Sequence, residues 1–274
     1  MMKPAARSAA SRVTEVVRGR SGGKSPVSSD VVAVEEPLEI RVRGRSVAVT
    51  MRTPGHDREL AAGFLLTERI IKQRKDLVDI ATCTASVEPQ NTLDVFLKAG
   101  VEVDFAALTR HVFATSSCGL CGKASIEAVK QHFPPVDSAL KLSARRITRL
   151  PDRMRAAQRT FSQTGGLHAA AGFNAQGKLL VLREDIGRHN AVDKVIGCAF
   201  LQDRFPLDAH ILLVSGRASF EILQKALAAR IPVICAVSAP SSLAVEFARA
   251  NGQTLIGFLR GDTMNIYAGA ERVS

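Results

Sequence analysis

The sequence contains no tryptophan, and aromatic residues make up only 5% of its 274 positions, with Tyr267 as the single tyrosine. Proteins that hold nucleic acid by base stacking need several aromatic side chains on one surface. Such a surface is difficult to assemble from this composition, so we expect no nucleic-acid partner.

Long apolar runs are also missing, because the longest, at about residues 231–239, has the length of a β-strand. A membrane-spanning helix needs roughly 20 consecutive apolar residues. The first residues, MMKPAARSAASR, lack the apolar core of a secretory signal peptide. We therefore expect a cytoplasmic protein with no membrane partner.

Cysteine is sparse and odd in number, which argues against a disulfide framework and favours reduced thiols. A structural zinc site usually takes its ligands from two close pairs, and this chain has one close Cys pair and no His-x₃-His pair. We therefore expect no metal. Cys198 and Cys235 lie in apolar stretches and are expected in the core. The five cysteines are Cys83, Cys118, Cys121, Cys198 and Cys235.

Positive charge is in excess, with 37 Lys and Arg against 26 Asp and Glu and a formal net charge of +11. Residues 1–30 contribute a net +4 of this, so the rest of the chain is basic in its own right. Such a charge fits an anionic partner, and it also fits a merely solvated basic surface.

The order of elements predicts an α/β protein in three parts. Residues 1–30 are small, polar and basic, and we expect a disordered basic tail there. Residues 31–135 are expected to form a smaller α/β region that ends in a C-x-x-C loop and a helix, stopped by Pro134-Pro135. In residues 136–274, strands alternate with helices of about 10–14 residues, which predicts a three-layer α/β/α domain. Strands are expected at 38–42, 47–51, 77–82, 92–97, 168–173, 178–182, 211–214, 233–237 and 254–259.

The segment SSCGLCGKAS places Cys118 and Cys121 in a glycine-rich turn that leads into a predicted helix. A helix N-terminus and the neighbouring Lys123 both lower the pKa of a thiol, and the thiolate is the reactive form. Three interpretations stay open: a redox dithiol, half of a metal site, and a nucleophilic or sulfur-carrying thiol. A zinc-dependent nucleobase deaminase would also need H-x-E, but Ala170 stands where that Glu would be.

Two further segments, REDIGRHNAVDK and SGRAS, each follow a predicted strand and lead into a predicted helix. In open α/β sheets this edge is where ligands bind. Arg188 with the helix N-terminus suits a phosphate, and the turn around Arg217 has the form of an anion cradle. A solvated loop is the alternative for both.

A last segment, FLRGDTMNIY, brings together the groups that bind a guanine nucleotide. Asp262 can accept hydrogen bonds from the guanine edge, Arg260 can neutralise phosphate, and Phe258 can stack. A basic turn after a strand is common, so this segment has limited weight by itself.

Five motifs occur in order over residues 53–269: TPGHDRELAAGFLLTERII, SSCGLCGKAS, EDIGRHNAVDKVIG, SGRASFEILQKA and GFLRGDTMNIYAG. Together they resemble the formate dehydrogenase accessory sulfurtransferase (FdhD) family. The resemblance implies a cytidine-deaminase-like α/β/α domain with a smaller N-terminal α/β region, and a homodimer.

The resemblance also implies a function. Members take sulfur from a cysteine desulfurase as a cysteine persulfide and transfer it to the molybdenum cofactor, bis(molybdopterin guanine dinucleotide), as formate dehydrogenase requires. The persulfide maps onto the C-x-x-C, with Cys118 preferred and Cys121 as its partner. GDP is the expected analogue of the cofactor. A non-catalytic chaperone that only shelters the cofactor is the alternative. The cofactor-binding residues expected are Phe258, Leu259, Arg260, Gly261, Asp262, Thr263, Arg188, His189 and Arg217.

Overall fold

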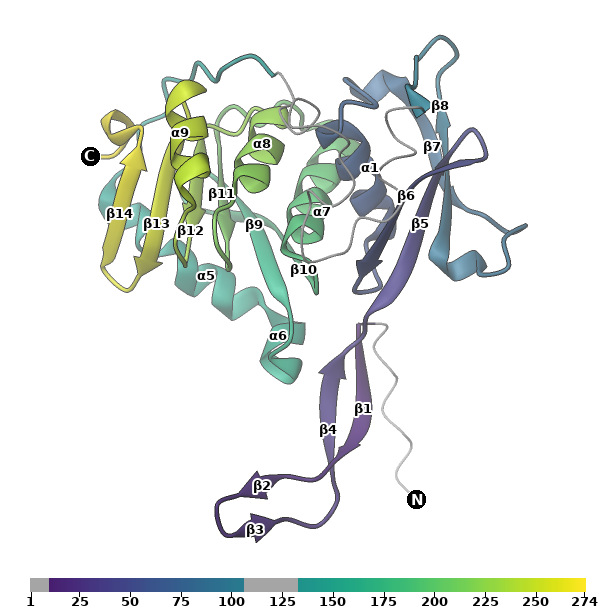
Figure 1. The fold of residues 1–274 in the computed structure, drawn as a ribbon. Coiled ribbons are helices and arrows are strands. Elements are labelled where there is room, and N and C mark those ends of the chain that lie inside the picture. The colour runs from purple at the N-terminus through teal and green to yellow at the C-terminus, as the bar shows by residue number, and fades with distance from the viewer. Residues whose placement is uncertain (1–9, 106–132) are drawn as a thin grey trace.

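The computed structural model describes residues 10–105 and 133–274, so Cys118, Cys121 and the helix expected after them lie outside the described residues. The described chain forms two sheets with helices between and beside them, and a separate hairpin near the N-terminus (Figure 1). No helix in these ranges is long and apolar enough to cross a membrane.

The larger sheet has six strands in the order β10-β9-β11-β12-β13-β14. Strands β11, β12 and β13 are parallel to one another, and the remaining neighbours pair antiparallel. The strands are β9 (His168–Asn174), β10 (Leu179–Asp185), β11 (His210–Val214), β12 (Val233–Ala236), β13 (Thr254–Arg260) and β14 (Thr263–Ala268).

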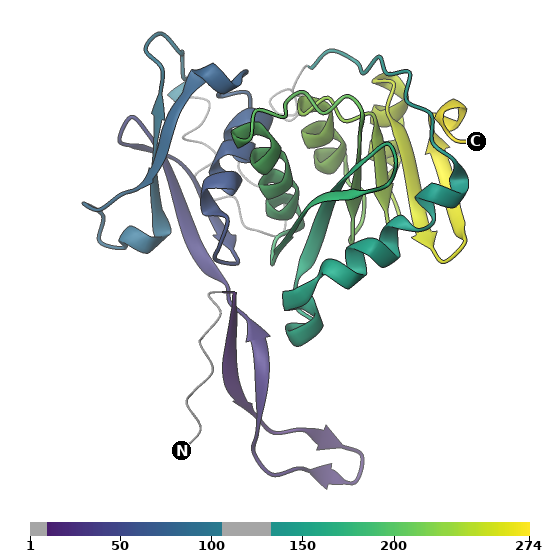
Figure 2. The ribbon, with the colours of Figure 1, turned by 180° about the vertical axis from the view of Figure 1, so that it is seen from behind.

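Helices cover both faces of this sheet (Figures 1 and 2). Both faces are covered because both faces of β11 are apolar, and successive side chains of a strand point to opposite faces. Leu212 and Val214 belong to the apolar cluster on one face. Ile211 and Leu213 belong to the cluster on the other. The chain is thus a mixed α/β protein as predicted, while the likeness to cytidine deaminases stays a prediction. Helices α7 (Arg188–Leu201), α8 (Phe220–Ala228) and α9 (Ser242–Ala250) lie on the first face, and α4 (Ala144–Ile147) and α5 (Leu150–Ala157) on the second.

The smaller sheet has the order β6-β5-β8-β7 and packs against α1 (Asp57–Thr67). Strands β7 and β8 have the residues that the sequence predicted, on the two sides of a Pro-Gln-Asn turn. The strands are β5 (Glu36–Val42), β6 (Arg45–Arg52), β7 (Leu77–Thr82) and β8 (Thr92–Leu97), with short 3₁₀ turns η1 (Arg74–Asp76), η2 (Pro89–Asn91) and, at the chain end, η4 (Ala270–Arg272).

Helices α1 and α7 cross at very short range and join the two sheets into one apolar core. A Cβ built on Gly63 would lie 1.9 Å from the Asp193 carbonyl oxygen, and one on Gly197 would lie 1.8 Å from the Glu59 carbonyl oxygen. Only glycine permits this approach. The resulting core runs from the small sheet through both helices to the large sheet, so it is continuous across the predicted boundary at residue 135.

From residue 10 onward, the structure differs from the expectation of a disordered tail over residues 1–30. Strand β1 (Ser11–Val16) pairs antiparallel with β4 (Ser28–Ala33), and β2 (Gly19–Arg20) with β3 (Gly23–Lys24), in a hairpin that projects from the body (Figure 1). The β-branched residues of β1 and β4 favour strands. The sequence analysis did not predict these strands because Val13 and Val32 are exposed, so the strands have no apolar face to reveal them.

Two other elements departed from the sequence-based expectation. Pro151 and Gly165-Gly166 predict the start and end of a single helix, but the chain is broken at Gln158 into α5 and α6 (Arg159–Thr164). Strand β14 was not predicted, since its residues are mostly exposed and were interpreted as a binding loop.

Replacing Gly63 or Gly197 with Ala should destabilise the protein by about 1–3 kcal/mol, because the new methyl group overpacks the helix crossing. This loss runs against helix propensity, which by itself favours Ala over Gly by about 1 kcal/mol. Urea unfolding measures the effect. Gly22→Ala is the control, since a Cβ there has nothing within 4 Å. Unchanged stability in both helix variants would contradict the described crossing.

Candidate functional site

The loops that follow β10, β11, β12 and β13 meet at one edge of the large sheet, as the sequence motifs predicted. The Ala218 amide donates to the Ala239 carbonyl over 3.2 Å, and the Phe258 amide donates to the Ser238 carbonyl over 3.1 Å. Arg260 Nε donates to the Val237 carbonyl over 3.0 Å. The SGRAS and FLRGD segments are therefore joined through the loop between β12 and α9.

A cleft of about 660 Å³ opens at this edge, between the sheet and the α5–α6 pair. Leu259, Arg260 and Gly261 line it, as do His168 and Ser215. Arg260 gives the cleft a positive charge. A cleft of this size with a cationic side chain and glycine backbone at its wall can accept a phosphorylated ligand.

The opposite wall holds residues that the sequence analysis did not single out. The Arg155 guanidinium lies over the Phe161 ring, with Cζ 4.6 Å from the ring centroid. Both line the cleft, and together they offer a flat stacked surface. Phe161 was expected only as part of a packed helix face, and no signal in the sequence marked either residue as a site residue.

His168, Arg188 and Gly216 meet beside the cleft. A Cβ on Gly216 would lie 3.4 Å from His168 Nδ1 and 4.0 Å from Arg188 Cδ. Burial and the nearby Arg188 charge lower the pKa of His168. The side chains of His168 and Arg188 thus lie together at this corner of the cleft, where Arg188 is charged and His168 is neutral at pH 7.

His189 lies behind this corner and is 6% exposed. Its Nε2 is 3.4 Å from Ser219 Oγ, in the loop that follows β11. Burial, together with the charge of Lys225 and then of Arg188, lowers its pKa to about 3. His189 is therefore neutral at pH 7. Its contact with Ser219 supports the loop that follows β11.

The Phe258–Thr263 segment is a hairpin between β13 and β14. Phe258 sits at a β-bulge with a φ of 51° and a ring that is 40% exposed. Left-handed backbone at a non-glycine residue costs about 1–3 kcal/mol and is typical of functional positions. Gly261 has a φ of 53°, and Asp262 and Thr263 are exposed beside it. Arg217 is also exposed.

Two charged residues of EDIGRHNAVDK, Asp185 and Lys194, lie in the core of the protein and not at the cleft. Asp185 and Lys194 form an ion pair of 2.6 Å, with side chains 0% and 1% exposed. Lys194 Nζ donates to the Thr53 carbonyl over 2.8 Å, and Asp185 accepts from the Thr53 amide over 3.2 Å. These side chains face neither solvent nor the cleft, and they bind the TPGHD segment instead.

Asp193 forms a second buried pair, with Lys225 of α8 at 2.8 Å. Thr67 Oγ1 donates to Asp193 over 2.9 Å and accepts from Lys225 over 3.0 Å. Burial raises the pKa of Asp193, against the opposing charge of Lys225. This network fastens α1, α7 and α8 to one another.

The sequence profile of the FdhD/NarQ family matches residues 33–274. The chain belongs to the FdhD/NarQ family. Sulfur carrier protein FdhD of Mycobacterium tuberculosis is 53% identical over 267 residues, covering 94% of this chain and 97% of that protein. The protein of the same name from Streptomyces coelicolor is 52% identical over 273 residues, covering 96% of each chain.

A solved structure of the same kind supports the fold. The crystal structure of a protein from Desulfotalea psychrophila, assigned as a formate dehydrogenase accessory protein, is similar with a TM-score of 0.77 and 26% identity. The match covers 97% of this chain and 100% of the other. The FdhD/NarQ membership expected from the motifs is thus confirmed.

The predicted persulfide cysteines of this FdhD/NarQ protein, Cys118 and Cys121, lie outside the described residues. Among the described cysteines, Cys83, Cys198 and Cys235 are buried and unpaired with each other. Burial raises the pKa of Cys235 to about 12. Cys198 and Cys235 are in the core as expected.

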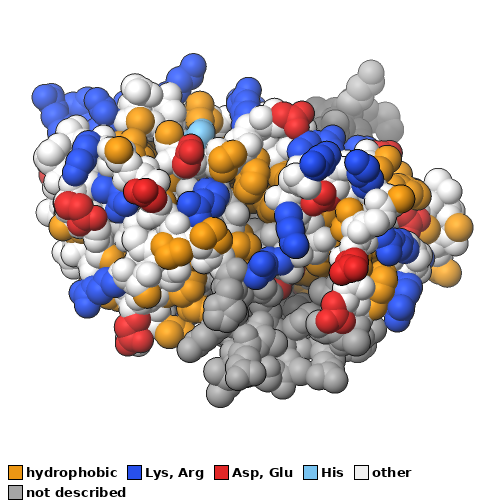
Figure 3. Space-filling view, turned by 90° about the horizontal axis from the view of Figure 1, so that it is seen from above, with side chains coloured by type: hydrophobic (Ala, Val, Ile, Leu, Met, Phe, Trp, Pro, Cys, Tyr) orange, Lys and Arg blue, Asp and Glu red, His pale blue; other side chains and the backbone are white. Residues whose placement is uncertain are grey.

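Seen from above, Lys and Arg side chains are spread over the surface with Asp and Glu among them (Figure 3). A protein that holds a nucleic-acid duplex usually gathers its basic side chains into one patch or stripe. On the face seen in Figure 3, the basic side chains form no such single patch.

The burial of His189 should give the protein a measurable pH dependence. The unfolded chain binds the His189 proton near pH 6.5 and the folded chain only near pH 3, so stability is lost as the pH falls below 6.5. Between about pH 7.5 and about pH 5.5 the wild type should lose roughly 1.4 kcal/mol more than His189→Gln. Urea unfolding across this range checks it. Parallel profiles for the two proteins would contradict a neutral, buried His189.

Proposed function

We propose that the protein is a sulfur carrier that receives sulfur from a cysteine desulfurase and transfers it to bis(molybdopterin guanine dinucleotide) for formate dehydrogenase. The observation that carries the proposal is the Arg260 cleft at the sheet edge, in a chain 53% identical to proteins named Sulfur carrier protein FdhD. The C-x-x-C of Cys118 and Cys121 supplies the thiols. We propose a homodimer as the working form.

Sulfur loading is a thiol exchange with no net redox change. The Cys118 thiolate attacks the outer sulfur of the desulfurase persulfide. A new S–S bond forms, the old one breaks, and the desulfurase cysteine leaves as a thiolate. A persulfide is more acidic than a thiol, so the loaded Cys118 is anionic at pH 7.

Two routes for release involve Cys121. In the first, Cys121 takes the outer sulfur by a second exchange and passes it on. In the second, the Cys121 thiolate attacks Cys118 Sγ, so that a Cys118–Cys121 disulfide forms and the outer sulfur leaves as hydrosulfide. The second route reduces the sulfur by two electrons and oxidises the cysteine pair, which a cellular thiol then reduces.

The cleft would hold a nucleotide end of the cofactor. Arg260 faces it as a phosphate partner, with Arg188 and Arg217 in the adjacent loops. Asp262 stands at the tip of the β13–β14 turn, where a carboxylate can pair with the N1 and N2 donors of guanine. The exposed ring of Phe258 would stack on the base. The neutral His189 orients the loop of Ser219 and adds no charge.

Incubation with a cysteine desulfurase and cysteine should add one sulfur, about 32 Da, to the wild-type chain as a persulfide. Cys118→Ala should abolish this gain, and the control Cys83→Ala should retain it. Intact-mass spectrometry decides the result. Unchanged loading of Cys118→Ala would overturn the assignment of that cysteine. A Cys118→Ala/Cys121→Ala protein that still activates formate dehydrogenase would favour the non-catalytic chaperone.

GDP should bind the protein, and ADP should bind much more weakly, because adenine leaves the Asp262 carboxylate unpaired. Asp262→Ala should erase this preference, and Arg260→Ala should weaken both nucleotides. Isothermal titration calorimetry measures the affinities. Arg145→Ala, which removes an exposed charge from α4, is the control. Equal affinity for GDP and ADP, or a preference that survives Asp262→Ala, would show that guanine is recognised elsewhere.

A further inference from the structure

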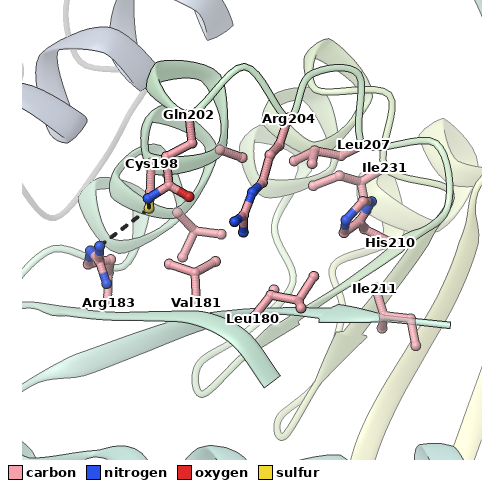
Figure 4. A pocket seen from close by; sticks show the side chains of 13 residues that line it. Leu180, Val181, Arg183, Cys198, Gln202, Arg204, Leu207, His210, Ile211 and Ile231 are labelled. Carbon is pink, nitrogen blue, oxygen red and sulfur yellow. Dashed lines mark hydrogen bonds between the residues drawn. The ribbon is translucent and has the colours of Figure 1, made fainter. Parts of the chain in front are cut away.

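A second cavity, of about 140 Å³, lies between α7 and the strands β9, β10 and β11 (Figure 4). His210 begins β11 and Ile231 lies just before β12, and both line the cavity. It is therefore at the amino edge of the parallel strands, opposite the edge that carries the Arg260 cleft. The proposed sulfur-carrier function makes no use of it.

The larger part of the cavity wall is apolar. Val181, Val195, Leu207, Ile211 and Ile231 line it. An engineered apolar cavity of about 150 Å³ accepts a benzene ring. A group of that size, either a ring or a short branched chain, therefore matches the space.

Within the described part of the chain, one unpaired positive charge borders the cavity, on Arg204, which is exposed to solvent. The Arg204 side chain points inward between Cys198 and His210 (Figure 4). Among residues 10–105 and 133–274, no hydrogen bond or ion pair of its guanidinium is found, whereas the neighbouring Arg183 is paired with Glu59 at 2.7 Å. Arg204 thus has the capacity to bind an anion here.

His210 adds a second polar group, which lies next to the Leu207 backbone. Its Nδ1 is shielded from solvent and makes no hydrogen bond to the described residues. A buried polar atom without a partner costs free energy, which a bound ligand would recover. Burial lowers the pKa of His210, so its ring is neutral, and the tautomer protonated on Nδ1 can donate to an anion.

Cys198 lines the same cavity but is unsuited to covalent chemistry. Arg183 Nη2 lies 3.4 Å and Gln202 Nε2 3.5 Å from its Sγ. Burial and the nearby Glu59 charge raise its pKa, so the thiol stays protonated. The cavity therefore binds its ligand without a covalent bond.

We propose that this cavity is a binding site for a compact apolar acid, a ring- or branched-chain-sized group that carries one carboxylate. The carboxylate pairs with Arg204 and accepts a hydrogen bond from His210 Nδ1. The apolar part fills the space between Val181 and Ile231.

Sodium benzoate is the probe, titrated into the full-length protein by calorimetry, with methyl NMR signals of Val181, Ile211 and Ile231 to locate it. We expect millimolar or tighter binding, with shifts at these methyl groups. Arg204→Met should weaken benzoate by about tenfold or more, since a hydrogen-bonded charge pair is lost. Benzyl alcohol, which has the same size and no charge, should bind wild type about as weakly as benzoate binds Arg204→Met.

Arg145→Met is the matched control, because it removes an equal charge from an exposed position on α4. It should bind benzoate like wild type. Ala199→Leu, which adds a side chain at the cavity wall, should prevent binding of both probes. No binding of benzoate to wild type, equal affinity for Arg204→Met and Arg145→Met, or methyl shifts confined to other residues would overturn the proposal.

Discussion

The ion pair between Asp185 and Lys194 is the contact on which the rest of the structure depends. Both side chains are almost fully buried, and each binds the backbone of Thr53 from the N-terminal region. Moving two charges out of water is costly, and removing one partner of such a pair typically costs about 3–5 kcal/mol. The pair therefore fastens the Thr53 backbone of the TPGHD segment to β10 and α7.

That placement determines the site. Asp185 Oδ1 accepts hydrogen bonds from the Gly187 amide at 2.8 Å and from Asn190 Nδ2 at 3.0 Å, and so fixes the start of α7. Arg188 and His189 follow directly in the first turn of α7. Both lie against the loop after β11, where His189 contacts Ser219 and Arg188 lies near Gly216. The close crossing at Gly63 and Gly197 holds α7 from its other side. The same contacts that join the two sheets thus orient the corner beside the Arg260 cleft.

Much of the fold could be predicted from the sequence, and the reasons are local. Strands β7 and β8 are two short apolar-rich segments on either side of a Pro-Gln-Asn turn. Ser241 caps α9 by accepting from the Ala244 amide at 3.2 Å. The gathering of the anion-binding motifs at one edge follows from the topology of parallel strands. Family membership came from the motifs taken together.

The remaining features depend on contacts between distant parts of the chain. Asp185 and Lys194 resemble site residues until their partner Thr53, more than a hundred positions earlier, is known. Arg155 and Phe161 lie six positions apart and would not share a face of one continuous helix, and the break at Gln158 lets both line the cleft wall. The β1–β4 hairpin has exposed valines on its strands, so no apolar face announces it.

The central claim is that both regions form one cooperative unit around the α1–α7 crossing. Native-state hydrogen exchange tests it most directly, by comparing amides in the centre of β5 with amides in the centre of β11. The account predicts that both sets exchange through global unfolding, with the same opening free energy and the same denaturant dependence. Exchange of the β5 amides at a clearly lower free energy than the β11 amides would show that the small sheet opens separately, and would contradict the account.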